Sequence, residues 1–248
     1  MTEGAIIPQM VLFALPLLLG NIFQLLYNTV DTIVVGNFVS TEALAAVGST
    51  SMIINIIVFF FNGLSVGASV VIGQSYGAKN RERLHIAVET TILMTLIASA
   101  VFTIIGILMV RPMLAFMSTP KDVLPEATIY LRIYFAGIAG LLIYNMGSGI
   151  FRAVGDSTRP LLLLIVTSIL NIFLDLLFVI RFHLGIAGVA YATIIAQAIS
   201  AVLVLRLLIC TDAVYWFSWK DMMIDSKLLK QKMSSRSAPY LSGQTASS

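Results

Sequence analysis

The stretch SILNIFLDLLFV, residues 168–179, is apolar along almost its whole length and nevertheless carries a carboxylic acid at Asp175. A second stretch, YNTVDTIVVG at residues 27–36, places Asp31 in a similar setting. A carboxylate at mid-membrane depth costs roughly 2.5–3.5 kcal/mol on insertion scales, so acids within membrane helices are rare and usually functional. We therefore expect these two acids to mark a functional site inside a bilayer.

The composition is that of a membrane protein. The chain is 58% hydrophobic and 11% charged, and its mean hydropathy is +0.97. Its single cysteine, Cys210, excludes an internal disulfide and a cysteine-based zinc site, and two histidines cannot build a histidine-rich metal cluster. The sequence contains no HExxH or P-loop motif, so we expect neither an enzyme, nor a cofactor, nor a transition-metal site.

The distribution of apolar residues predicts an all-α integral membrane protein, with six transmembrane helices in one bundle over residues 1–210. Each predicted helix has the roughly 20 apolar residues that a crossing requires. Gly63, Gly67, Ala68 and Gly73 predict a small-residue packing face on the second helix. An amphipathic cytoplasmic linker is expected at 211–233, and a disordered tail at 234–248 that we interpret as the product of a truncation or frameshift. The six helices are expected near 10–38, 45–75, 86–110, 125–150, 160–181 and 184–209.

The basic residues predict the orientation, because lysine and arginine concentrate on the cytoplasmic side. With a cytoplasmic N-terminus, eleven of the fifteen lysines and arginines fall on the inner side and only Arg111, Lys121, Arg132 and Arg181 fall on the outer side. Both termini are then cytoplasmic. The inner set is Lys79, Arg81, Arg83, Arg152, Arg159, Arg206, Lys220, Lys227, Lys230, Lys232 and Arg236.

The depth of the polar residues in the membrane indicates one site. At about 1.5 Å per residue, Asp175 lies about 22 Å from the start of its helix at Pro160, leaving about 8 Å of a core about 30 Å thick. By the same rise, Asp31 lies about 12 Å and Thr193 about 13 Å from the outer face. Asn171 shares a helix face with Asp175. Asp31, Asp175 and Thr193 are therefore expected at similar heights in the outer half.

Two carboxylates grouped with an amide and a hydroxyl in a low-dielectric environment can serve two related purposes. Their oxygen atoms can coordinate a hard cation such as Na⁺, or desolvation and like-charge repulsion can make one carboxyl hold a proton. In either case occupancy changes the local charge and hence the preferred helix packing. The alternative is that each acid is only bonded to a neighbouring helix as part of packing. Glu89, one turn inside the third helix, is expected at the interface, and candidate cavity-lining residues are Asn21, Gln24, Tyr27, Tyr130, Asn145 and Ser148.

Several longer motifs resemble those of the multidrug and toxic compound extrusion (MATE) family, prokaryotic type. Besides YNTVDTIVVG, they are LSVGASVVIGQSYGAKN at 64–80, GSGIFRAVGDSTRP at 147–160, LNIFLD at 170–175 and LGIAGVAYAT at 184–193. They occur in the order and spacing of the family. The resemblance covers about residues 8–230 and matches the N-terminal half of these transporters.

The resemblance implies that the bundle is the N-lobe of a twelve-helix inverted-access transporter fold in the bacterial cytoplasmic membrane. It implies export of small organic, often cationic, compounds driven by H⁺ or Na⁺. The family's cation site falls here on Asp31, Asn171, Asp175 and Thr193. Tyr27 and Tyr130 match cavity positions, and Ser148 departs from an asparagine that certain relatives place in the same network.

The chain departs from the family more strongly in its length than at Ser148, because members of this family are about twice as long. The chain is then expected to need a missing second six-helix half or a homodimer partner. Two other functions remain open: a lipid-linked saccharide flippase of the same superfamily, which would need cavity arginines for a diphosphate, and a non-transporting membrane fragment or assembly partner.

Overall fold

A computed structural model of the chain describes residues 6–209, with side chains from Met10 onward. The linker and tail expected at 211–233 and 234–248 lie outside the described residues. A five-residue π-helical turn, η1 (Leu177–Arg181), follows the fifth helix directly. The helices are α1 (Ile6–Phe38), α2 (Thr41–Gly77), α3 (Arg81–Phe116), α4 (Leu124–Ala153), α5 (Thr158–Leu176) and α6 (Gly185–Ile209).

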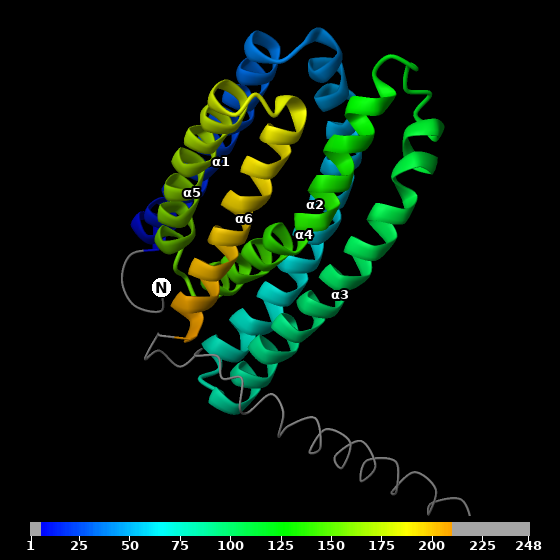
Figure 1. Ribbon diagram of the computed structural model, residues 1–248. Coiled ribbons are helices and arrows are strands. Elements are labelled where there is room, and N and C mark those ends of the chain that lie inside the picture. The colour runs from blue at the N-terminus through cyan, green and yellow to red at the C-terminus, as the bar shows by residue number, and fades with distance from the viewer. Residues whose placement is uncertain (1–5, 210–248) are drawn as a thin grey trace, which may run out of the picture.

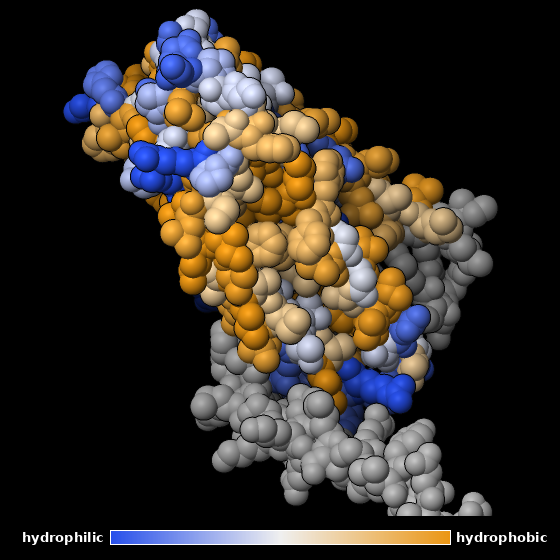
Figure 2. Space-filling view, turned by 90° about the vertical axis from the view of Figure 1, so that its right-hand side faces the viewer, coloured by the Kyte–Doolittle hydropathy of each residue, from blue (hydrophilic) through white to orange (hydrophobic). Residues whose placement is uncertain are grey.

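The helices form one bundle whose central member is α4 (Figure 1). Helix α4 packs against α2, α3 and α6, while α1 packs mainly on α5, which in turn packs on α6. Within the described part of the chain, six helices are long and apolar enough to cross a membrane. On the face shown in Figure 2, apolar residues cover the middle of the bundle and hydrophilic residues lie toward its two ends. The expected all-α six-helix fold is confirmed.

Local hydrogen bonds explain where several helices begin. The Ser40 hydroxyl accepts a hydrogen bond from the Ala43 backbone N–H at 3.1 Å. The side-chain oxygen Oδ1 of Asn80 accepts one from the Arg83 backbone N–H at 3.0 Å. These side chains satisfy backbone donors that the first turns of α2 and α3 leave without intrahelical partners. At the start of α5, Asp156 Oδ1 accepts bonds from the N–H groups of Thr158 and Arg159, both at 3.1 Å.

The third helix is longer than expected. It extends over Arg81–Phe116, whereas hydrophobicity predicted 86–110. The charged segment Arg81–His85 is helical because Asn80 caps it, although its composition resembles a loop. At the far end the helix continues through Pro112 to Phe116.

At the glycines of the described chain, the closest approach to the backbone of a neighbouring helix occurs between α4 and α6. A Cβ added to Gly140 would lie 2.8 Å from the Ala198 backbone nitrogen, and one added to Gly147 would lie 2.2 Å from a Val204 methyl group. Among the described residues nothing lies within 4 Å of a Cβ placed on Gly63 or Gly67. The predicted packing role of these two glycines within the bundle is therefore wrong, since hydrophobicity does not reveal which helix face meets a neighbour.

Candidate functional site

The four predicted site residues come together between α1, α5 and α6. Asp31 comes from α1, Asn171 and Asp175 from α5, and Thr193 from α6. At about 1.5 Å per residue, Asp31 lies about 10 Å before Phe38, Asp175 about 9 Å before Arg181, and Thr193 about 12 Å after Gly185. The exposed fractions of these four side chains are 9% for Asp31, 1% for Asn171, 0% for Asp175 and 3% for Thr193.

The Asn171 amide joins three helices. In one orientation of the amide group, its nitrogen faces hydrogen-bond acceptors and its oxygen faces a donor. We assign this orientation on that basis. In it, Nδ2 donates to Asp31 Oδ1 at 3.0 Å and to Asp175 Oδ2 at 3.3 Å, while Oδ1 accepts from the Thr193 backbone N–H at 3.3 Å. Asn171 thus links the two acids to each other and to α6.

The two acids form a close pair with unused bonding capacity. The carboxyl groups of Asp31 and Asp175 lie close to each other, because both accept from the same Asn171 amide nitrogen. Asp175 Oδ1 is buried and has no hydrogen-bond partner among the described residues. Two carboxylates in contact repel each other strongly where water is excluded, so a proton or a bound cation between them would relieve the repulsion.

Thr193 contributes to the site in two ways. Its backbone N–H meets Asn171, as described above, and its hydroxyl donates to the Val189 carbonyl oxygen of its own helix at 3.0 Å. Back-bonding of this kind is common for threonine in helices. The hydroxyl oxygen keeps lone pairs with which it can bind a cation.

Three tyrosines surround the acid pair. Tyr27, one turn before Asp31 on α1, lies near both the Asp31 carboxyl and the Thr193 side chain. Tyr130 and Tyr134 on α4 are 6% and 5% exposed, and their rings stack with centroids 6.3 Å apart. Tyr134 also lies close to Gln197 of α6.

A small polar pocket of about 80 Å³ adjoins the site. It is lined in part by Asn171 and Thr193, and its volume is enough for a few water molecules. Gln24 and Tyr27 are the only predicted cavity residues that line it. The rest of its lining is Leu141, Tyr144, Leu164, Thr167, Ser168, Ala196, Gln197 and Ser200.

The remaining predicted cavity residues are placed elsewhere. Tyr130 is buried beside the acids, and Asn21 is exposed on α1. The Asn145 amide donates to the Leu141 carbonyl oxygen of its own helix at 3.0 Å. Ser148 is buried on α4, eighteen residues beyond Tyr130 (148 minus 130), which is about 27 Å along the helix. Ser148 is therefore not part of the network around Asp175, because the two lie near opposite ends of the bundle.

A second buried polar pair was not anticipated. Glu89 on α3 is 5% exposed, and His85 Nε2 lies 3.1 Å from Glu89 Oε1. The side chain of Glu89, which is expected at the membrane interface, is covered by neighbouring helices of the bundle. The four-residue spacing of a histidine and a glutamate on one helix is the signal that could have revealed this contact.

The fold and this site define a multi-pass membrane protein of the transporter class, with ionisable residues buried between helices. The sequence profile of the MatE family matches residues 16–177, and the chain belongs to this family.

Two relatives and one solved structure illustrate the similarity. The chain is 36% identical over 192 residues to the probable multidrug resistance protein YoeA of Bacillus subtilis, covering 76% of this chain and 42% of that protein. It is 33% identical over 199 residues to the probable multidrug resistance protein YpnP of the same organism, covering 80% of this chain and 45% of that one. A transporter of the MOP superfamily from Pyrococcus furiosus superposes with a TM-score of 0.81 at 28% identity, covering 86% of this chain and 47% of that one.

The chain spans about half the length of the relatives it matches. These relatives are transporters, and they support a multi-pass bacterial membrane protein with the fold of one half of a family member.

Proposed function

We propose that the chain is the N-lobe of a multidrug exporter in which H⁺ or Na⁺ drives the outward movement of small organic, often cationic, compounds. Asp31, Asn171, Asp175 and Thr193 bind the coupling ion. The observation that carries this proposal is the fully buried Asp175 carboxyl, which shares the Asn171 amide with Asp31 and has one oxygen free of hydrogen bonds.

The proposed mechanism follows from electrostatics. When the site is empty, two negative charges on α1 and α5 repel each other. When a proton or Na⁺ binds, the repulsion falls and the two helices can approach. Asp175 lies two residues before the π-helical turn η1. Such turns are often found at functional sites in helices, and a movement of Asp175 would take place directly beside this one. The polar pocket gives water a place beside the site.

A polar face on α1 supports the presence of a second half. Asn21, Gln24 and Asn28 are all exposed and follow the spacing of one helix face. Uncovered in a bilayer, these amides would meet lipid, which is unfavourable. We infer that this face lines a central cavity opposite a second six-helix half, on the same chain or on another copy, and that substrates contact it there. Alternating access requires two such halves.

The membrane orientation belongs to the same proposal. The end of the bundle that holds the α2–α3 turn, the α4–α5 turn and the end of α6 faces the cytoplasm. Lys79, Arg81, Arg83, Arg152 and Arg159 lie at these turns, as the positive-inside rule requires.

A flippase for lipid-linked saccharides is less well supported. Recognition of a diphosphate calls for arginine. None of the twelve residues that line the polar pocket is an arginine, and Arg132 is exposed on α4.

The test compares Asp31→Asn and Asp175→Asn with Asp122→Asn, an exposed acid in the α3–α4 connection that serves as the matched control. Binding of radiolabelled Na⁺ to the purified chain, and proton release when ethidium is added in weak buffer, report the coupling ion. Ethidium export by vesicles containing the chain and a second half reports transport. We expect both site variants to lose ion binding or proton release and to lose export, with the control unchanged. Wild-type export by the variant carrying both site substitutions would refute the proposal.

A further inference from the structure

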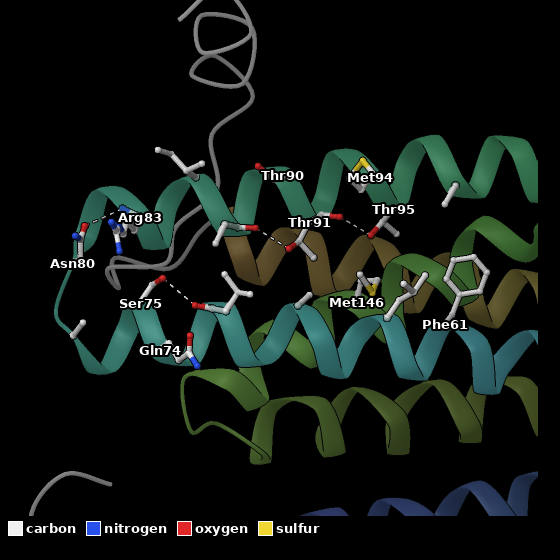
Figure 3. A pocket seen from close by; sticks show the side chains of 17 residues that line it. Phe61, Gln74, Ser75, Asn80, Arg83, Thr90, Thr91, Met94, Thr95 and Met146 are labelled. Atoms are coloured by element: carbon white, nitrogen blue, oxygen red, sulfur yellow. Dashed lines mark hydrogen bonds between the residues drawn. The ribbon is translucent and has the colours of Figure 1, made fainter. Parts of the chain in front are cut away.

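A large cleft runs between α2 and α3, away from the acid pair. Its volume is about 820 Å³, within the range of ligand-binding pockets. Met146 of α4 contributes to its inner wall, and Phe61 lies near one end (Figure 3). Leu64, Val71 and Met94 line it and are 47%, 54% and 60% exposed, so the cleft opens on the outer surface of the bundle.

The wall of the cleft is largely apolar, and three of the four hydroxyl groups that line it are bonded to their own helices. Thr91 donates to the Ala87 carbonyl oxygen and Thr95 to the Thr91 carbonyl oxygen, both at 2.7 Å, and Ser75 donates to the Val71 carbonyl oxygen at 2.9 Å (Figure 3). Because these hydroxyl protons are bonded to their own helices, they are not available to a ligand. The long part of the cleft therefore suits a hydrocarbon chain.

The end of the cleft near the α2–α3 turn is different. Arg83 is the only charged side chain among the seventeen described residues that line it, and Gln74 and Asn80 lie at the same end (Figure 3). Lys79 and Arg81 adjoin this end, and Glu82 leaves a net charge of +2 over residues 79–83 (three basic residues minus one acid). The first turn of the long helix α3 adds the positive end of a helix dipole.

The length of the cleft matches one leaflet of a bilayer. From Arg83 to Ala98 is fifteen residues (98 minus 83), or about 22 Å along α3. Half of a bilayer of about 40–45 Å, headgroups included, has the same extent.

We propose that this cleft binds an anionic phospholipid, with the headgroup phosphate at Arg83 and an acyl chain between α2 and α3. Arginine binds phosphate oxygens through two parallel hydrogen bonds, and basic pockets between membrane helices on the cytoplasmic side select anionic lipids. The surrounding positive charge repels the ammonium group of a zwitterionic headgroup. The lipid site is independent of ion coupling, and it belongs to the cytoplasmic leaflet in the orientation proposed above.

The experiment titrates the purified full chain with phosphatidylglycerol or phosphatidylcholine carrying identical acyl chains, and counts bound lipid by native mass spectrometry. Arg83→Gln removes the charge that lines the cleft. Arg81→Gln is the matched control, because Arg81 is exposed on the same helical turn and does not line the cleft. Ala68→Phe places a ring in the cleft, and thermal unfolding verifies that each variant is folded.

We expect phosphatidylglycerol to bind about fivefold more tightly than phosphatidylcholine, the factor expected from one basic residue at a membrane surface. Arg83→Gln should remove most of this preference and Arg81→Gln should keep most of it, while Ala68→Phe should weaken both lipids. Equal affinity for the two lipids, or equal loss in Arg81→Gln and Arg83→Gln, would overturn the proposal. Competition by inorganic phosphate alone would indicate a free-anion site instead, and loss of lipid on self-association would indicate that a second copy covers the cleft; both results also reject it.

Discussion

Asp31 on α1 and Asp175 on α5 accept hydrogen bonds from one and the same amide, that of Asn171, at 3.0 and 3.3 Å. The two helices are thereby held together through polar groups inside an otherwise apolar bundle. A contact of this kind is favourable only while the charges of both acids are balanced.

Replacing Asn171 by alanine should destabilise the chain. The substitution leaves two buried carboxyl oxygens without their donor, and an unsatisfied buried polar group costs about 1–3 kcal/mol. We expect a lower midpoint of thermal unfolding in detergent. Combined with Asp175→Asn, the change in the unfolding midpoint should differ from the sum of the two single changes, because the residues share one network. Strictly additive losses would show that Asn171 does not bridge the acids.

Replacing Thr193 by valine separates the two roles of this residue. The backbone N–H that donates to Asn171 is retained, and the hydroxyl donates to the Val189 carbonyl oxygen of its own helix. We therefore expect Thr193→Val to lower the affinity for the coupling ion several-fold while changing the unfolding midpoint little. Thr193→Ser keeps the oxygen atom and serves as the control. Unchanged ion binding in Thr193→Val would remove the hydroxyl from the ligand set.

Replacing Gly140 by alanine should force α4 and α6 apart. The new methyl group would lie 2.8 Å from backbone atoms of Gln197 and Ala198, which cannot rotate away as a side chain could. Overpacking typically costs about 1–3 kcal/mol, and the unfolding midpoint reports it. Gly63→Ala is the matched control, because no described atom lies within 4 Å of its added Cβ and alanine favours the helix. Equal stability of the two variants would contradict the close approach of α4 and α6.

Replacing Asp156 by alanine should weaken the start of α5. The change removes two bonds to backbone N–H groups and the contact between Asp156 Oδ2 and Arg159 Nε at 3.1 Å. Loss of such a cap costs about 1 kcal/mol, while the half-exposed ion pair adds little. Hydrogen exchange should accelerate at the first turn of α5 and not elsewhere. Asp122→Ala, in an exposed turn, should have no effect, and an identical exchange pattern in both variants would argue against the cap.

Hydrophobicity alone was enough to predict six membrane helices and to place Asp31, Asp175 and Thr193 at similar heights. Apolar length and the rise per residue are local properties, so they can be read from one segment at a time. The acids stood out because a charge inside an apolar run is costly wherever the run packs. Hydrophobicity placed the start of α3 too late in the sequence, because the boundary there is set by the Asn80 cap.

The sequence by itself therefore determined which segments are long and apolar enough to cross a membrane, and at which position along its helix each polar residue lies. Only the tertiary structure decided which faces meet: the Asn171 bridge, the α4–α6 glycine contacts, the burial of Glu89 and the separation of Ser148 from the acids. The physical reason is that these helices are apolar on nearly every face, so the sequence pattern does not reveal the rotation of each helix about its axis. That rotation is set by side-chain packing between segments far apart in the chain.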